Sequence, residues 1–133
     1  MNEKVIAIDP KFLPAHDSLG VIFKELGHIQ KAISCYKKAI EIDPKYAEAY
    51  NNLAVALKNS GRHSEAAVSY QHAIDIQPGS ASPHYNLGNL YHAVGSYDKS
   101  IEQYRRCIEL NPKNAEFYNA LASSLSNGGQ YLN

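Results

Sequence analysis

The chain has 133 residues, of which 44% are hydrophobic and 20% are charged, and its formal net charge at pH 7 is zero. This length fits one domain, and this composition is that of a folded globular chain rather than a disordered one. Nucleic-acid binding draws on clustered Lys and Arg, so a balance of thirteen basic and thirteen acidic residues argues against such a partner. We interpret the longest basic runs, Lys37-Lys38 and Arg105-Arg106, as solvated helix surface.

Membrane and secretory signals are missing from the sequence. No apolar stretch approaches the roughly 20 residues that a membrane-spanning helix needs, so no membrane association is predicted. The start, Met1-Asn2-Glu3-Lys4, lacks the basic and then apolar layout of a secretory signal. Cys35 and Cys107 are too few for a disulfide framework, which favours a reducing compartment, cytoplasmic or nuclear.

One sequence motif recurs along the chain at a fixed interval. EIDPKYAEAYNNLA at 41–54 returns as ELNPKNAEFYNALA at 109–122, and DIQPGSASPHYNLG at 75–88 lies midway, 34 residues from each. Proline at 10, 44, 78 and 112 and glycine at 27, 61, 95 and 129 keep the same spacing. Proline separates one helix from the next, and glycine accepts the left-handed conformation of a tight turn. Each unit is thereby divided into two segments of helical length.

In chain order, the predicted elements are helix pairs with partial units at both ends. The segments are a partial second helix at 1–12, full repeats at 13–46, 47–80 and 81–114, and a partial fourth repeat at 115–133. Apolar residues such as Leu53, Ala54 and Leu57 recur at helical spacings, and strand-like alternation is absent. The predicted fold is all-α, a single α-solenoid of stacked antiparallel helix hairpins.

Small residues mark the expected close contacts within each hairpin. Gly20, Ala54, Gly88 and Ala122 share one phase of the repeat. Because so small a side chain lets a neighbouring helix approach closely, we expect the tightest packing of each hairpin at these positions.

These residues resemble the tetratricopeptide repeat (TPR) family, whose signature is W-x2-L-G-x2-Y, then A-x3-F, then P. The matching positions are His16, Leu19-Gly20, Phe23, Ala32, Tyr36 and Pro44 in the first repeat, and Tyr50, Leu53-Ala54, Leu57, Ala66, Tyr70 and Pro78 in the second. They are His84, Leu87-Gly88, Tyr91, Ser100, Tyr104 and Pro112 in the third, and a fourth repeat opens with Tyr118, Leu121-Ala122 and Leu125. His replaces the large aromatic residue twice, and Ser100 replaces the usual alanine.

No residue pattern predicts catalysis, a metal site or a cofactor. His84 and His92 are about 12 Å apart along a helix, neither cysteine belongs to a C-x2-C pair, and no HExxH or G-x-S-x-G motif occurs. We expect His16 and His84 to pack in the core and both cysteines to be inert packing residues. The chain is therefore predicted not to be an enzyme.

The resemblance implies a superhelix whose first helices line a concave groove for other proteins. The predicted peptide-binding residues on that face are Asn51, Asn52, Lys58, Tyr85, Asn86, Asn89, His92 and Asn119. An asparagine amide can pair with both groups of a peptide bond, so a row of them could hold an extended polypeptide by its backbone. In this respect the chain is similar to the repeat array of O-linked N-acetylglucosamine transferase, and we read it as a fragment of a larger TPR protein of that type or as an unusually short protein. Only Asn52 and Asn86 keep the exact phase, since Ser18 and Ala120 replace their equivalents.

Three alternatives stay open. The asparagines could be ordinary solvated residues of the family pattern. A carboxylate clamp for peptide C-termini, as in some family members, is disfavoured, because it needs basic side chains on this face. Asp17 and Asn51 stand where one clamp lysine is expected, and Ser82 or Glu116 stands at another clamp position. The array could instead be a structural scaffold that self-associates through uncapped ends, where Val5, Ile6 and Ile8 would be exposed.

Overall fold

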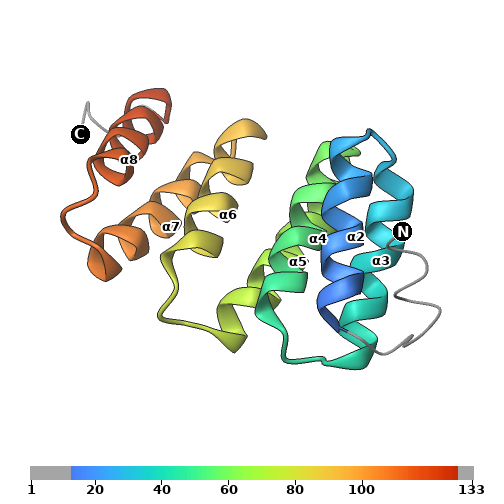
Figure 1. Cartoon of the computed structure of the whole chain (residues 1–133). Coiled ribbons are helices and arrows are strands. Elements are labelled where there is room, and N and C mark those ends of the chain that lie inside the picture. Colours follow the sequence, from blue (N-terminus) through green and yellow to red (C-terminus); the bar gives the residue numbers. More distant parts are fainter. Residues whose placement is uncertain (1–12, 129–133) are drawn as a thin grey trace. The chain divides into compact units, whose positions relative to one another are not determined.

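The computed structural model describes residues 13–128, and in this range the chain consists of helices joined by short turns (Figure 1). The helices are α2 (Leu13–Glu25), α3 (Ile29–Ile42), α4 (Ala47–Asn59), α5 (His63–Ile76), α6 (Ala81–Ala93), α7 (Tyr97–Leu110) and α8 (Ala115–Asn127). We call α2, α4, α6 and α8 the A helices and α3, α5 and α7 the B helices. The all-α prediction is confirmed, whereas the segments expected at 1–12 and beyond Gly128 lie outside the described residues.

The helices form two compact units, α2 to α5 and α6 to α8. In the first unit, α2 pairs with α3 and α4 pairs with α5, and α3 also packs against α4. In the second unit, α6 pairs with α7, which also packs against α8. Neighbouring A helices touch within each unit, α2 with α4 and α6 with α8. Each unit thus has the stacked helix pairs that the period predicts, while the repeat boundaries given above stay predictions.

Glycine turns join the two helices of each full repeat. Gly27, Gly61 and Gly95 have φ angles of 84°, 84° and 83°, which is the left-handed region expected for them. After α4, the Arg62 amide donates to the Leu57 carbonyl at 2.8 Å and the Gly61 amide donates to the Lys58 carbonyl at 3.0 Å. These two bonds form a Schellman motif, which satisfies carbonyls left open at the helix end.

Prolines separate the repeats, as the sequence predicts. The B helices end at Ile42, Ile76 and Leu110, each two residues before a proline. The residue before a proline is disfavoured in the helical conformation, and this stops the helix. Proline and glycine therefore set where the helices end in every repeat.

The core of each hairpin is a tyrosine ring placed against an A helix. Tyr36, Tyr70 and Tyr104 are buried at the same position of successive B helices. A Cβ atom built on Gly20 would lie 2.5 Å from Cε1 of Tyr36, and one built on Gly88 would lie 2.6 Å from Cε1 of Tyr104. The glycines therefore mark the close approach predicted for them, because the tyrosine ring lies where a larger side chain would be.

The two histidines at the aromatic position are core residues, as expected. His16 and His84 are both buried. Nδ1 of His84 lies 2.7 Å from the Oε1 atom of Gln103, within hydrogen-bond distance. This hydrogen bond links α6 to α7 inside the second unit.

Candidate functional site

The predicted binding residues all lie on A helices, and they divide between the two units. Those on α4 belong to the first unit and the others to the second. The first-unit face is defined by six residues of α2 and α4: Val21, Lys24, Asn51, Asn52, Val55 and Lys58. Val21 and Lys24 are the repeat equivalents of Val55 and Lys58. The second-unit face is defined by residues of α6 and α8: Tyr85, Asn86, Asn89, His92 and Asn119. Helical spacing places the members of each helix on one side of it.

The first-unit face combines two lysines with a shallow apolar strip. Lys24 lies in the last turn of α2 and Lys58 in the last turn of α4, 34 residues apart, and both are half-buried. A cation at this place interacts favourably with the negative end of the helix dipole. Val21 and Val55, one turn earlier, are also half-buried. In the described part of the chain neither lysine forms an ion pair, so both charges can meet a ligand.

Most asparagines of the two A-helix faces are only partly exposed. Asn51, Asn52 and Asn86 are half-buried, and each already takes part in an interaction within the protein. Asn119 on α8 is exposed. Replacing the half-buried asparagines should therefore be accompanied by a stability measurement.

Two residues of the second-unit face serve its packing. The Tyr85 ring lies 5.2 Å from the Phe117 ring and 6.0 Å from the Tyr104 ring, measured between centroids, so it connects all three helices of the unit. The Asn89 side-chain oxygen accepts a hydrogen bond from the Tyr104 hydroxyl at 2.5 Å. This bond avoids the cost of burying the Tyr104 hydroxyl without a partner. The side-chain oxygen of Asn89 is thus already hydrogen-bonded to the core residue Tyr104.

His92 is also held within the second unit, by a network that the sequence analysis missed. Its Nδ1 lies 2.8 Å from Oγ of Ser124, its Nε2 lies 3.3 Å from Nδ2 of Asn127, and its ring packs edge-on against Tyr97. Ser124 is fully buried and lies 2.7 Å from the hydroxyl oxygen of Ser100. The Ser124 hydroxyl is therefore satisfied inside the unit.

A sequence signal for this network did exist. Ser100 stands where the earlier repeats have Ala32 and Ala66, and Ser124 stands where they have Ala56 and Leu90. One serine in a core position has little meaning alone. Two of them on helices that pack together indicate a paired hydrogen bond, because a lone buried hydroxyl is unfavourable.

Groups that could act as nucleophiles are kept protonated by burial. Burial raises the pKa of the Cys107 thiol to about 11 and also raises the pKa of Cys35. It likewise raises the pKa of the Tyr70 hydroxyl to about 12. A thiol is reactive as the thiolate, so both cysteines are suited to packing, as expected. Among residues 13–128, no group of three or more His, Cys, Asp or Glu side chains could hold a metal ion.

The repeat geometry agrees with a known family. A profile described as "TPR repeat" matches residues 20–61, 57–95 and 88–128, which together span most of the chain. The chain belongs to the tetratricopeptide repeat family. Its TPR repeats build an all-α solenoid of about three repeats and make it a protein-interaction module. None of the described helices is long and apolar enough to cross a membrane.

Solved structures show the same TPR fold. A crystal structure of MamA has a TM-score of 0.88 and 29% sequence identity, with 96% of this chain and 75% of that chain covered. The first TPR domain of Spaghetti (RPAP3), bound to the HSP90 peptide SRMEEVD, has a TM-score of 0.80 and 22% identity, with 86% and 90% covered. At 22% identity, the similarity to the RPAP3 domain shows the fold alone. A comparison with curated proteins finds no match.

Proposed function

We propose that this TPR module binds extended polypeptide segments along its A-helix faces, with Asn52 and Asn86 pairing with the peptide backbone. The observation that carries the proposal is the recurrence of a half-buried asparagine at one repeat position, on α4 in the first unit and on α6 in the second. Each amide offers one acceptor and two donors, which suits the C=O and N–H of a peptide bond. Both side chains already take part in an interaction within the protein, so a ligand would meet partly restrained groups.

The solved TPR neighbour supports a peptide ligand. The RPAP3 domain is bound to the HSP90 peptide SRMEEVD, so a domain of this fold is seen with a short polypeptide. For the present chain we do not propose a clamp on the terminal carboxylate, because Asn51 and Ser82 stand at clamp positions where a basic residue is expected. Lys24 and Lys58 lie elsewhere on the first-unit face. The likeness to glycosyltransferase arrays rests on the asparagines alone and stays part of this proposal.

The test is a titration with labelled peptides. A pool of labelled peptides of varied sequence is screened first, and the tightest binder is then titrated against the wild type and a variant with Asn52→Ala and Asn86→Ala. Each lost hydrogen bond should cost about 0.5–1.5 kcal/mol of binding, so the double variant should bind roughly tenfold more weakly. Melting temperatures measured in parallel separate lost contacts from lost fold, since both side chains are half-buried.

The matched control is Asn111→Ala. Asn111 is an exposed asparagine in the turn after α7, away from both A-helix faces, and its replacement should leave peptide affinity unchanged. Normal binding by a folded double variant would remove the asparagines from the mechanism. Absence of any binder in the pool would contradict the proposed function as a whole.

A further inference from the structure

A groove of about 400 Å³ runs along α3 in the first unit, and it is separate from the first-unit face on the A helices. Its lining residues are Gln30, Ile33, Ser34, Lys37, Lys38, Glu41 and Arg62. The six residues of α3 follow one another at spacings of three and one, so they form a single stripe on the helix. Arg62 comes from the turn between α4 and α5, which supplies the other side of the groove.

The groove has an apolar floor and basic walls. Ile33 is buried, whereas Ser34, Lys37 and Lys38 are exposed on either side of it. Three of the lining residues are cations and Glu41 is the one anion among them, while Arg62 is also paired with Glu65 beside the groove, so the excess positive charge is that of the lysines. This balance differs from that of the chain as a whole, whose formal net charge is zero.

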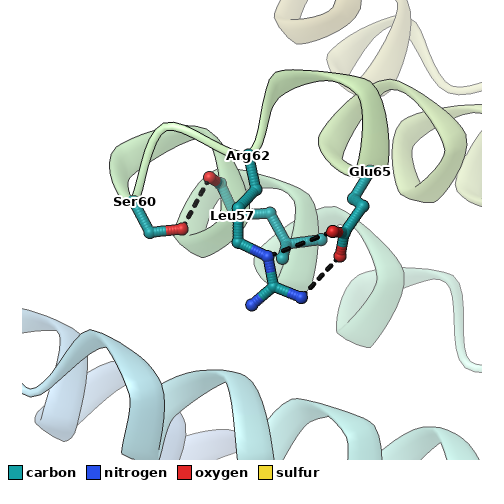
Figure 2. A network of polar contacts seen from close by, with 4 residues as sticks. All are labelled: Leu57, Ser60, Arg62 and Glu65. Atoms are coloured by element: carbon teal, nitrogen blue, oxygen red, sulfur yellow. Dashed lines mark hydrogen bonds and ion pairs between the residues drawn. The ribbon is translucent and has the colours of Figure 1, made fainter.

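Arg62 is held in place by a carboxylate beside the groove (Figure 2). Its Nε donates to Oε1 of Glu65 at 3.2 Å and its Nη2 donates to Oε2 at 2.6 Å. A two-point pair of this kind fixes the plane of the guanidinium. The two bonds leave Nη1 of Arg62 available, and the side chain is 35% exposed. The hydroxyl of Ser60 donates to the Leu57 carbonyl at 2.9 Å and ties down the same turn.

Two elements bring their charges together at this place. The hydrogen bond from Arg62 lowers the pKa of the Glu65 carboxyl, and the charges of Arg62 and Lys37 lower it as well. Lys37 on α3 therefore lies close enough to act on a carboxylate at the start of α5. The positive charge of the groove thus comes from α3 and from the turn before α5, and does not belong to one helix surface alone.

The equivalent groove of the second unit lacks this basic character. It has a volume of about 340 Å³ and is lined by Asp98, Ile101, Glu102 and Arg105. These residues come 68 positions after Gln30, Ile33, Ser34 and Lys37, so the floor isoleucine is kept while two acids replace neutral residues. The basic groove on α3 is therefore a property of these side chains and not of the repeat fold.

We propose that the α3 groove binds an acidic polypeptide segment at a site separate from the A-helix faces. Lys37, Lys38 and Nη1 of Arg62 would hold carboxylates, because charge-assisted hydrogen bonds to them are strong and set the orientation of the ligand. The stripe from Gln30 to Glu41 spans about 16 Å at 1.5 Å per residue. Roughly five residues of extended chain cover that length. The end of the bound segment that lies beside Glu41 should carry no acidic residue, because the two negative charges would repel each other.

The probe is a fluorescein-labelled peptide that alternates Glu and Ser, titrated by fluorescence anisotropy at low ionic strength. The variant Lys37→Ala with Lys38→Ala should bind it roughly tenfold more weakly than the wild type. Added salt should weaken wild-type binding, because these charges are exposed and screened. A peptide that alternates Lys and Ser should not bind.

The second unit provides a matched control. Arg105 and Arg106 occupy the positions equivalent to Lys37 and Lys38, and both are exposed, so Arg105→Ala with Arg106→Ala removes the same charge. This control should change the affinity less than about twofold. Equal loss in both double variants would mean attraction by net charge and would overturn the site.

Two further outcomes would also overturn the proposal. One is the absence of saturable binding by the wild type. The other is tighter binding of a single-stranded oligouridine with the same dependence on Lys37 and Lys38, which would identify a nucleic-acid site instead. Circular dichroism of each variant confirms that the helices are intact, so a change in affinity reports on the groove.

Discussion

At the scale of single residues, the contact between Gly88 and Tyr104 shows how little space each hairpin leaves. The tyrosine ring lies where the Cβ of a larger residue at position 88 would be. The second repeat has Ala54 at this position, and both Ala54 and its partner Tyr70 are fully buried. An alanine is therefore accommodated when the ring is placed for it, whereas a longer side chain would have to displace the ring and the helix.

We predict that Gly88→Leu destabilises the protein clearly more than Ser126→Leu does. Overpacking of a helix interface typically costs about 1–3 kcal/mol, while Ser126 is exposed near the end of α8 and has room for the same side chain. The measurement is the midpoint of chemical denaturation for both variants. Equal midpoints would contradict the assigned register of α6 against α7.

At the scale of elements, the turns within the hairpins depend on backbone conformation more than on side-chain contacts. No atom lies within 4 Å of a Cβ built on Gly95 or on Gly79, so neither glycine is required for space. Gly95 has a φ of 83°, in the left-handed region, whereas Gly79 is not among the glycines with positive φ. Comparing Gly95 with Gly79 therefore separates the effect of the left-handed backbone conformation from the effect of the small size of glycine.

Gly95→Ala should lower the free energy of unfolding by about 1 kcal/mol, because an alanine is strained in the left-handed conformation. Gly79→Ala should be neutral or slightly stabilising, since it restricts the unfolded chain without such strain. Thermal melting of the two variants tests this difference. If both substitutions had the same effect, the turn after α6 would not depend on its left-handed residue.

At the scale of the whole molecule, both units bury ionisable groups in their neutral form. Desolvation raises the pKa of Tyr70 in the first unit and of Tyr104 in the second to about 12, and that of Cys107 to about 11. In each case the folded state keeps a proton at a pH where the unfolded state has lost it. Stability therefore falls as pH rises, because deprotonation is easier in the unfolded chain.

Melting temperature should accordingly stay level from about pH 7 to the ordinary thiol pKa near 8.5 and then fall as pH rises toward 11. The cysteines titrate first, and the tyrosines add their contribution above about pH 10. The earlier repeats have Ala39 and Ala73 at the position of Cys107, so Cys107→Ala should fold normally. In that variant the fall between about pH 8.5 and 10 should be shallower, because only the Cys35 thiol remains to titrate there. An unchanged profile would show that the Cys107 thiol has no part in it.

The sequence by itself determined the helices, their pairing and their turns. Proline and glycine act on the backbone of their own and adjacent residues, so Pro44 and Gly61 stop a helix or form a turn whatever surrounds them. The spacing of 34 residues then assigned the core tyrosines and the small residues opposite them. These predictions hold because each rests on a local interaction that repeats along the chain.

Only the tertiary structure decided which polar side chains are available to a ligand. His92, Asn89 and Tyr85 share the helix side of Asn86, yet they are committed to Ser124, Tyr104 and Phe117 on other helices. Likewise, Lys37 and Lys38 look like any solvated pair until Arg62 is found across the groove. A side chain's partners on another helix depend on how the helices pack, and the periodicity of one helix contains no information about them.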